Sequence, residues 1–125
     1  MDIQKRIKSF GYAINGIRLL FSSQANARIH LFVALLVVIA GLTCGVSPAE
    51  WLAIFISVSM VIAMEAMNTA LEWLTDLVSP DYHPLAGKVK DVAAAAVLIT
   101  VIGAVVAGLI IFVPKITYLS VLVFS

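Results

Sequence analysis

Residues 51–78 read WLAIFISVSMVIAMEAMNTALEWLTDLV, and this stretch decides the fold. Its first half is apolar, as a helix that crosses a membrane requires. The helical pattern then continues through four polar positions, at Glu65, Asn68, Glu72 and Asp76. The sequence therefore predicts a membrane-spanning helix that carries a polar stripe along its second half.

Two further uncharged runs flank this helix, at residues 31–46 and 92–113. With their neighbouring residues they approach the roughly 20 residues that a spanning helix needs. Residues 79–84 are predicted to connect two helices, because they contain Pro80 and Pro84 and proline stops a helix. We predict spanning helices over 29–46, 51–78 and 89–113.

The composition supports this class of protein. The 125 residues are 62% hydrophobic and 12% charged, with a net charge of +1. Soluble domains are nearer half apolar and about a quarter charged. Disordered proteins, nucleic-acid-binding domains and ordinary soluble enzymes are therefore excluded. The prediction is an all-α integral membrane protein with a single domain over residues 1–125.

The N-terminal segment has a different pattern. In residues 2–22, apolar side chains recur every three or four positions, and most lysines and arginines fall elsewhere on the helix. This is typical of an amphipathic helix that lies in the membrane interface. The alternative is a soluble helix packed on a domain, which the short chain hardly provides.

Basic residues orient the chain in the membrane. Seven of the eight lie before the first span or in the second connection, and Lys115 lies on the other side. The positive-inside rule then places the N-terminus and the 79–91 loop in the cytoplasm.

The polar stripe carries the chemistry. At about 100° per residue, Glu65, Glu72 and Asp76 fall on one helix face. Ionisable groups in a bilayer are costly, so these side chains must face a partner, a watery cleft or a cation. Carboxylates at a membrane surface suit Mg²⁺ with phosphate oxygens. The alternative is a buried polar network that only holds helices together.

Two motifs resemble a known family. They are Glu65-Ala-Met-Asn68-Thr69-Ala-Leu-Glu72, followed by Asp76, and His83-Pro-Leu-Ala-Gly-Lys-Val-Lys90-Asp91. Together with Asn26-Ala-Arg-Ile-His30, they resemble the prokaryotic diacylglycerol kinase / undecaprenol kinase family over roughly residues 8–113.

The resemblance implies a homotrimeric lipid kinase of the bacterial inner membrane. Such a kinase uses ATP with Mg²⁺ to phosphorylate a membrane lipid alcohol by direct phosphoryl transfer. By likeness, Glu65 is the general base and Glu72 is a metal ligand. The nucleotide site would comprise Tyr12, Asn68, Glu72, Asp76, Lys90 and Asp91.

One position departs from the family pattern. Gln24 stands where the family typically has a second metal-binding glutamate, and a neutral amide is a poorer Mg²⁺ ligand. A non-catalytic kinase-like scaffold therefore stays open. A small cation-coupled transporter also stays open, because the stripe around Glu65 could bind a cation in the membrane. For Arg28, phosphate contact and an interface anchor are both open, and His30 is interpreted as a helix-end interface residue.

Overall fold

The computed structural model describes residues 3–124, and they form helices joined by short connections. The helices are α1 (Ile3–Ser23), α2 (Ala25–Cys44), α3 (Pro48–Val78) and α4 (Pro84–Phe124). No strand occurs within these residues, so the all-α prediction is confirmed. By length and composition, α2, α3 and α4 can each cross a membrane.

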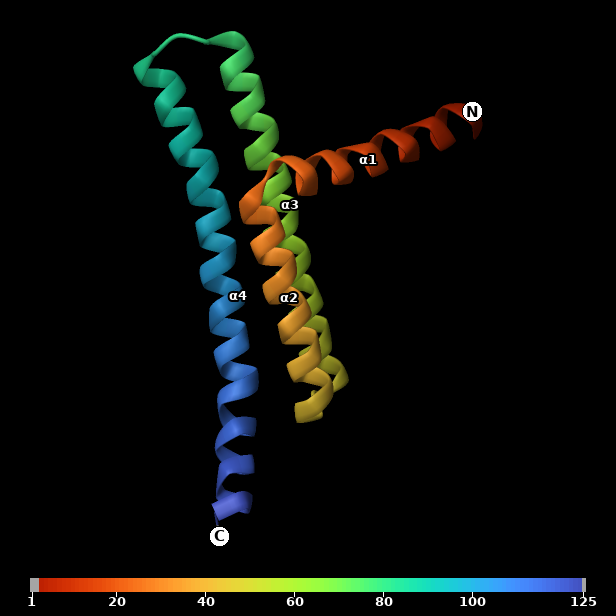
Figure 1. Ribbon diagram of the computed structural model, residues 1–125, viewed down its shortest axis with the longest axis vertical. Coiled ribbons are helices and arrows are strands. Elements are labelled where there is room, and N and C mark those ends of the chain that lie inside the picture. The colour runs from red at the N-terminus through yellow and green to blue at the C-terminus, as the bar shows by residue number, and fades with distance from the viewer. Residues whose placement is uncertain (1–2, 125) are drawn as a thin grey trace.

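Helices α2, α3 and α4 form a bundle, and α1 projects from its side. In Figure 1, α3 and α4 run side by side in opposite directions, and α2 packs against α3. Helix α1 leaves this bundle at a steep angle, so its N-terminal end lies far from α4. Leu20 is the buried residue of α1. The location of α1 in a membrane interface stays a prediction.

The hairpin between α2 and α3 is fixed by local chemistry at residues 45–50. Gly45 ends α2 in the left-handed conformation, at φ 65°, which glycine adopts without steric cost. Ser47 then caps α3 and forms a capping box with Glu50, in which each side chain accepts a backbone N–H. This short turn sets the register in which α2 and α3 face each other.

A close contact just inside this turn makes Gly41 the one glycine of the spans that a neighbour crowds. A Cβ atom at Gly41 would lie 2.6 Å from Cη2 of Trp51, whose ring stacks on Phe55. The indole therefore packs directly on the backbone of α2, as small residues permit between membrane helices.

Gly41→Ala is expected to lower the stability of the purified chain. Overpacking of this kind costs about 1–3 kcal/mol. Thermal unfolding in detergent measures the effect. Gly103→Ala is the matched control, because a Cβ atom there meets nothing within 4 Å. Equal melting temperatures for the two variants would contradict the packing described here.

Helix α4 is longer than predicted. We expected a helix over 89–113 that ends before Pro114, whereas α4 runs from Pro84 to Phe124 with Pro114 inside it. Proline removes one backbone N–H, but membrane helices tolerate this where nearby groups re-satisfy the backbone. The carbonyl that loses its donor is that of Ile110, four residues before Pro114. Lys115 also pairs with Glu50 at 3.1 Å, which ties this part of α4 to the start of α3.

The first span also begins earlier than predicted. We expected it over 29–46, but α2 starts at Ala25, directly after the end of α1. For Arg28, phosphate contact and an interface anchor were both open. Its guanidinium instead donates to the carbonyls of Phe21 and Ser22, at 2.9 and 3.1 Å. Arg28 therefore stabilises the corner between α1 and α2, since these carbonyls end α1 without helical partners.

Candidate active site

The predicted general base, Glu65, is buried in the middle of α3. Its side chain is 5% exposed, and Oε1 lies 3.1 Å from Nε2 of His30 on α2. The two residues meet because the hairpin brings them to similar depth. His30 lies 15 residues before Gly45, and Glu65 lies 17 residues after Pro48. A buried carboxylate needs such a donor, so the pair is a structural requirement as well as a candidate site.

Asn68 and Glu72 form the next step of the polar stripe. The amide Nδ2 of Asn68 donates to Oε1 of Glu72 at 3.0 Å. The other amide atom, Oδ1 of Asn68, is buried without a hydrogen-bond partner within the described residues. An unsatisfied buried acceptor is costly, so this oxygen is available to a water molecule, a ligand or a cation.

Asp76 and Lys90 extend the site from α3 to α4. Nζ of Lys90 pairs with Oδ1 of Asp76; the Asp76 side chain is exposed and the Lys90 side chain is half-buried. Asp91 follows on α4 and is exposed. Exposure along α3 thus rises from Glu65, through the half-buried Glu72, to Asp76, whose side chain is 62% exposed. The stripe is closed at Glu65 and open near the connection at residues 79–83.

Two predicted site residues lie apart from this stripe. Tyr12 is 76% exposed on α1, the helix that projects from the bundle in Figure 1. Gln24 is half-buried at the start of α2, and its amide donates to the Ser23 hydroxyl at 3.4 Å. Within residues 3–124, no hydrogen bond joins Gln24 to Glu72. One chain therefore brings together Asn68 with Glu72 and Asp76 with Lys90, but not Tyr12 or Gln24.

The donor set fits a metal that arrives with phosphate. Among the described residues, no group of three or more His, Cys, Asp or Glu could hold an ion. Mg²⁺ in phosphate-transferring sites is held by one or two carboxylates, substrate phosphates and water. The Glu72 carboxylate and the free Oδ1 of Asn68 supply oxygen donors of this kind.

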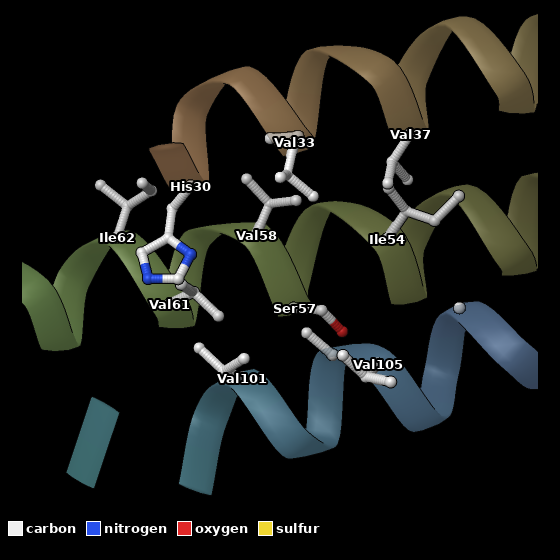
Figure 2. Close-up of a pocket in the computed structure, with 13 residues that line it drawn as sticks. His30, Val33, Val37, Ile54, Ser57, Val58, Val61, Ile62, Val101 and Val105 are labelled. Atoms are coloured by element: carbon white, nitrogen blue, oxygen red, sulfur yellow. The ribbon is translucent and has the colours of Figure 1, made fainter. Parts of the chain in front are cut away.

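His30 was missed as a member of the site. Figure 2 shows its imidazole pointing from α2 into the space between α2, α3 and α4, near Val61 and Val101. This space is an apolar cavity of about 200 Å³. The equal depth of His30 and Glu65 on either side of the turn was the signal that could have paired them. An ionisable residue at membrane depth needs a partner, and each is the nearest candidate for the other.

Comparison with known proteins decides the family. The family described as prokaryotic diacylglycerol kinase matches residues 11–112, which is most of the chain. The chain belongs to this family. Among its relatives, the undecaprenol kinase of Bacillus subtilis (strain 168) is 35% identical over 114 residues, which are 91% of this chain and 93% of the relative.

Relatives named diacylglycerol kinase are about as similar to this chain. The diacylglycerol kinase of Synechocystis sp. is 37% identical over 90% of this chain and 65% of its own length. The diacylglycerol kinase of Escherichia coli (strain K12) is 34% identical over 80% of this chain and 82% of its own. Membership of the diacylglycerol kinase family makes this chain a lipid kinase, and its three apolar helices indicate a multi-pass membrane protein.

Proposed function

We propose that this member of the family transfers the γ-phosphoryl group of ATP to the hydroxyl of a membrane lipid alcohol, with Mg²⁺. The lipid is diacylglycerol or undecaprenol, as the names of the relatives suggest. The observation that carries the proposal is the graded stripe on α3. It joins a buried carboxylate, suited to a proton acceptor, to an open polar end suited to a nucleotide.

Glu65 is the proposed general base. A carboxylate oxygen takes the proton of the lipid hydroxyl while that hydroxyl oxygen bonds to the γ-phosphorus. The bond from the γ-phosphorus to the bridging oxygen breaks, and ADP leaves. General-base catalysis of this kind contributes about 10²–10⁴-fold to a rate. Positioning the two substrates supplies much of the remainder.

The nucleotide would bind along the open part of the stripe. Lys90 offers an ammonium group to the phosphates, and Asp76 holds this group in place through their ion pair. By the family resemblance, Asn68 and Asp91 would also line the nucleotide site. Tyr12 would cover the nucleotide from α1, which requires a movement of α1 or a contribution from another subunit. The proposed metal ligands are Glu72 and, with its amide oxygen, Gln24. Bound Mg²⁺ would neutralise phosphate charge.

The proposed assembly is a homotrimer in the bacterial inner membrane. Most large apolar side chains of α2, α3 and α4 are exposed in the single chain, so lipid or neighbouring subunits must cover them. The excess of Lys and Arg before the first span and in residues 79–91, which comprise the connection and the start of α4, supports a cytoplasmic location for both segments. The nucleotide end of the stripe would then face cytoplasmic ATP, with α1 in the interface.

The experiment offers both lipids in parallel. Purified chain in bicelles receives ATP, Mg²⁺ and either diacylglycerol or undecaprenol, and the phosphorylated lipid is quantified. Phosphorylation of one lipid supports the proposal and names the substrate. Tight ATP binding without turnover on either lipid would favour the scaffold, and ion uptake into proteoliposomes without ATP would favour the transporter.

Gln24→Glu is expected to raise activity at low Mg²⁺, because a carboxylate binds Mg²⁺ better than an amide.

Lys90→Ala is expected to raise the KM for ATP by about 10–100-fold, the range set by one hydrogen bond to a charged group. Steady-state kinetics at saturating lipid measures the change. Lys88→Ala is the matched control, because it removes the same charge from an exposed position one half-turn earlier. Equal KM values for both variants would remove Lys90 from the nucleotide site.

A further inference from the structure

We propose that His30 is a positioning residue for Glu65, and this inference rests on the proposed role of Glu65 as general base. Nε2–H of His30 donates to Oε1 of Glu65. That bond fixes the carboxylate and leaves its second oxygen, Oε2, to take the proton from the lipid hydroxyl.

The contact has the features of a built pair. Nε2 and Oε1 are 3.1 Å apart, and the side chains come from different helices. Within residues 3–124, His30 is the side chain with which the Glu65 carboxylate makes a polar contact. Thr69 donates to the Glu65 backbone carbonyl, at 2.8 Å, so it does not orient the carboxylate. A neutral imidazole with its proton on Nε2 suffices for the bond.

The imidazole of His30 lies in a largely apolar environment. Figure 2 shows apolar side chains around the imidazole, among them Val61 of α3 and Val101 of α4. Without His30, the Glu65 carboxylate would lose the side-chain partner that the described residues give it, and it would gain freedom to rotate. A misplaced general base is costly, because a displacement of about 1 Å can reduce a rate about 10²-fold.

The predicted effect lies in turnover rather than in nucleotide binding. His30 is placed against Glu65, whereas the proposed nucleotide residues lie further along α3 and on α4. Loss of the donor is therefore expected to lower kcat and leave the KM for ATP nearly unchanged.

Paired substitutions separate orientation from space filling. His30→Phe keeps an aromatic ring but removes the donor, and it is expected to lower kcat by about 10–100-fold. His30→Gln restores an N–H donor and is expected to recover most of the activity. Ile29→Ala is the matched control, since Ile29 is its exposed neighbour on α2. Full activity of His30→Phe, or equal losses in His30→Phe and His30→Gln, would overturn the proposal.

A spectroscopic signature tests the bond without relying on an active variant. The chain has two histidines, so ¹⁵N-histidine labelling gives a simple spectrum. Glu65→Leu, which removes the acceptor, is expected to shift the ring nitrogen signals of His30 and leave those of His83 unchanged, because His83 lies in the 79–83 connection. Unchanged His30 signals would contradict the bond.

The two proposals fail differently. Absence of lipid phosphorylation by the wild-type chain would refute the lipid kinase mechanism itself. An active wild type with an inactive Glu65→Gln and a fully active His30→Phe would refute only the role of His30.

Discussion

Glu65→Gln is expected to reduce lipid phosphorylation by about 10²–10⁴-fold, the usual contribution of a general base. The amide keeps the shape of the side chain and still accepts a hydrogen bond from His30, but it cannot take a proton. The KM for ATP is expected to change little, because Glu65 lies at the closed end of the stripe. Initial rates at saturating ATP and lipid measure the loss.

Glu50→Gln provides the control for this experiment. It makes the same change on the same helix, at a carboxylate that pairs with Lys115 near the opposite end of α3. Its rate is expected to match the wild type. A Glu65→Gln variant that keeps more than about half of the wild-type rate would exclude general-base catalysis by this residue.

Asn68→Leu is expected to produce a comparable loss, of about 10²-fold in kcat/KM for ATP. Asn68 holds Glu72 through Nδ2 and offers its unpartnered Oδ1 to a ligand. Leucine keeps the approximate volume but removes both functions, and hydrogen bonds to charged groups are worth about 1.5–3 kcal/mol each. Nucleotide binding measured by calorimetry, with the rate of lipid phosphorylation, reports the effect.

Asn15→Leu is the comparison for Asn68, because Asn15 is an exposed asparagine on α1. It is expected to leave both measurements unchanged. If Asn68→Leu binds ATP and turns over like the Asn15 variant, then the buried Oδ1 does not face the nucleotide or its metal.

The spans and the polar stripe could be predicted because they depend on local periodicity. Uncharged runs of sufficient length predict spanning helices, and the spacing of Glu65, Glu72 and Asp76 places them on one face in any α-helix. The pairing of Asn68 with Glu72 has the same origin, since residues four apart are neighbours on a helix.

Contacts between helices were harder to predict. The partner of Glu65 depends on the register of α2 against α3, which the turn at residues 45–47 sets. Likewise, Arg28 donates to the end of α1 because the chain bends sharply at Gln24. Helix α4 passes through Pro114 because a membrane helix withstands the loss of one backbone bond better than a soluble helix does.

The family resemblance predicted more site residues than a single chain brings together. Tyr12 and Gln24 were assigned to the nucleotide and metal sites, yet neither contacts the stripe within the described residues of this chain. Their assignment depends on a movement of α1 or on a second subunit.

Crosslinking between cysteines introduced at Tyr12 and Asp91 is expected to join different subunits of the proposed homotrimer.

Transfer of label from ATP to lipid tests the central claim most directly. Purified chain in bicelles is given ATP labelled in the γ-phosphate, Mg²⁺ and lipid alcohol, and the extracted lipid is counted. We predict label in the lipid, none stably bound to the protein, and none in either when EDTA removes the metal. Unlabelled lipid beside folded protein that binds ATP would contradict the account.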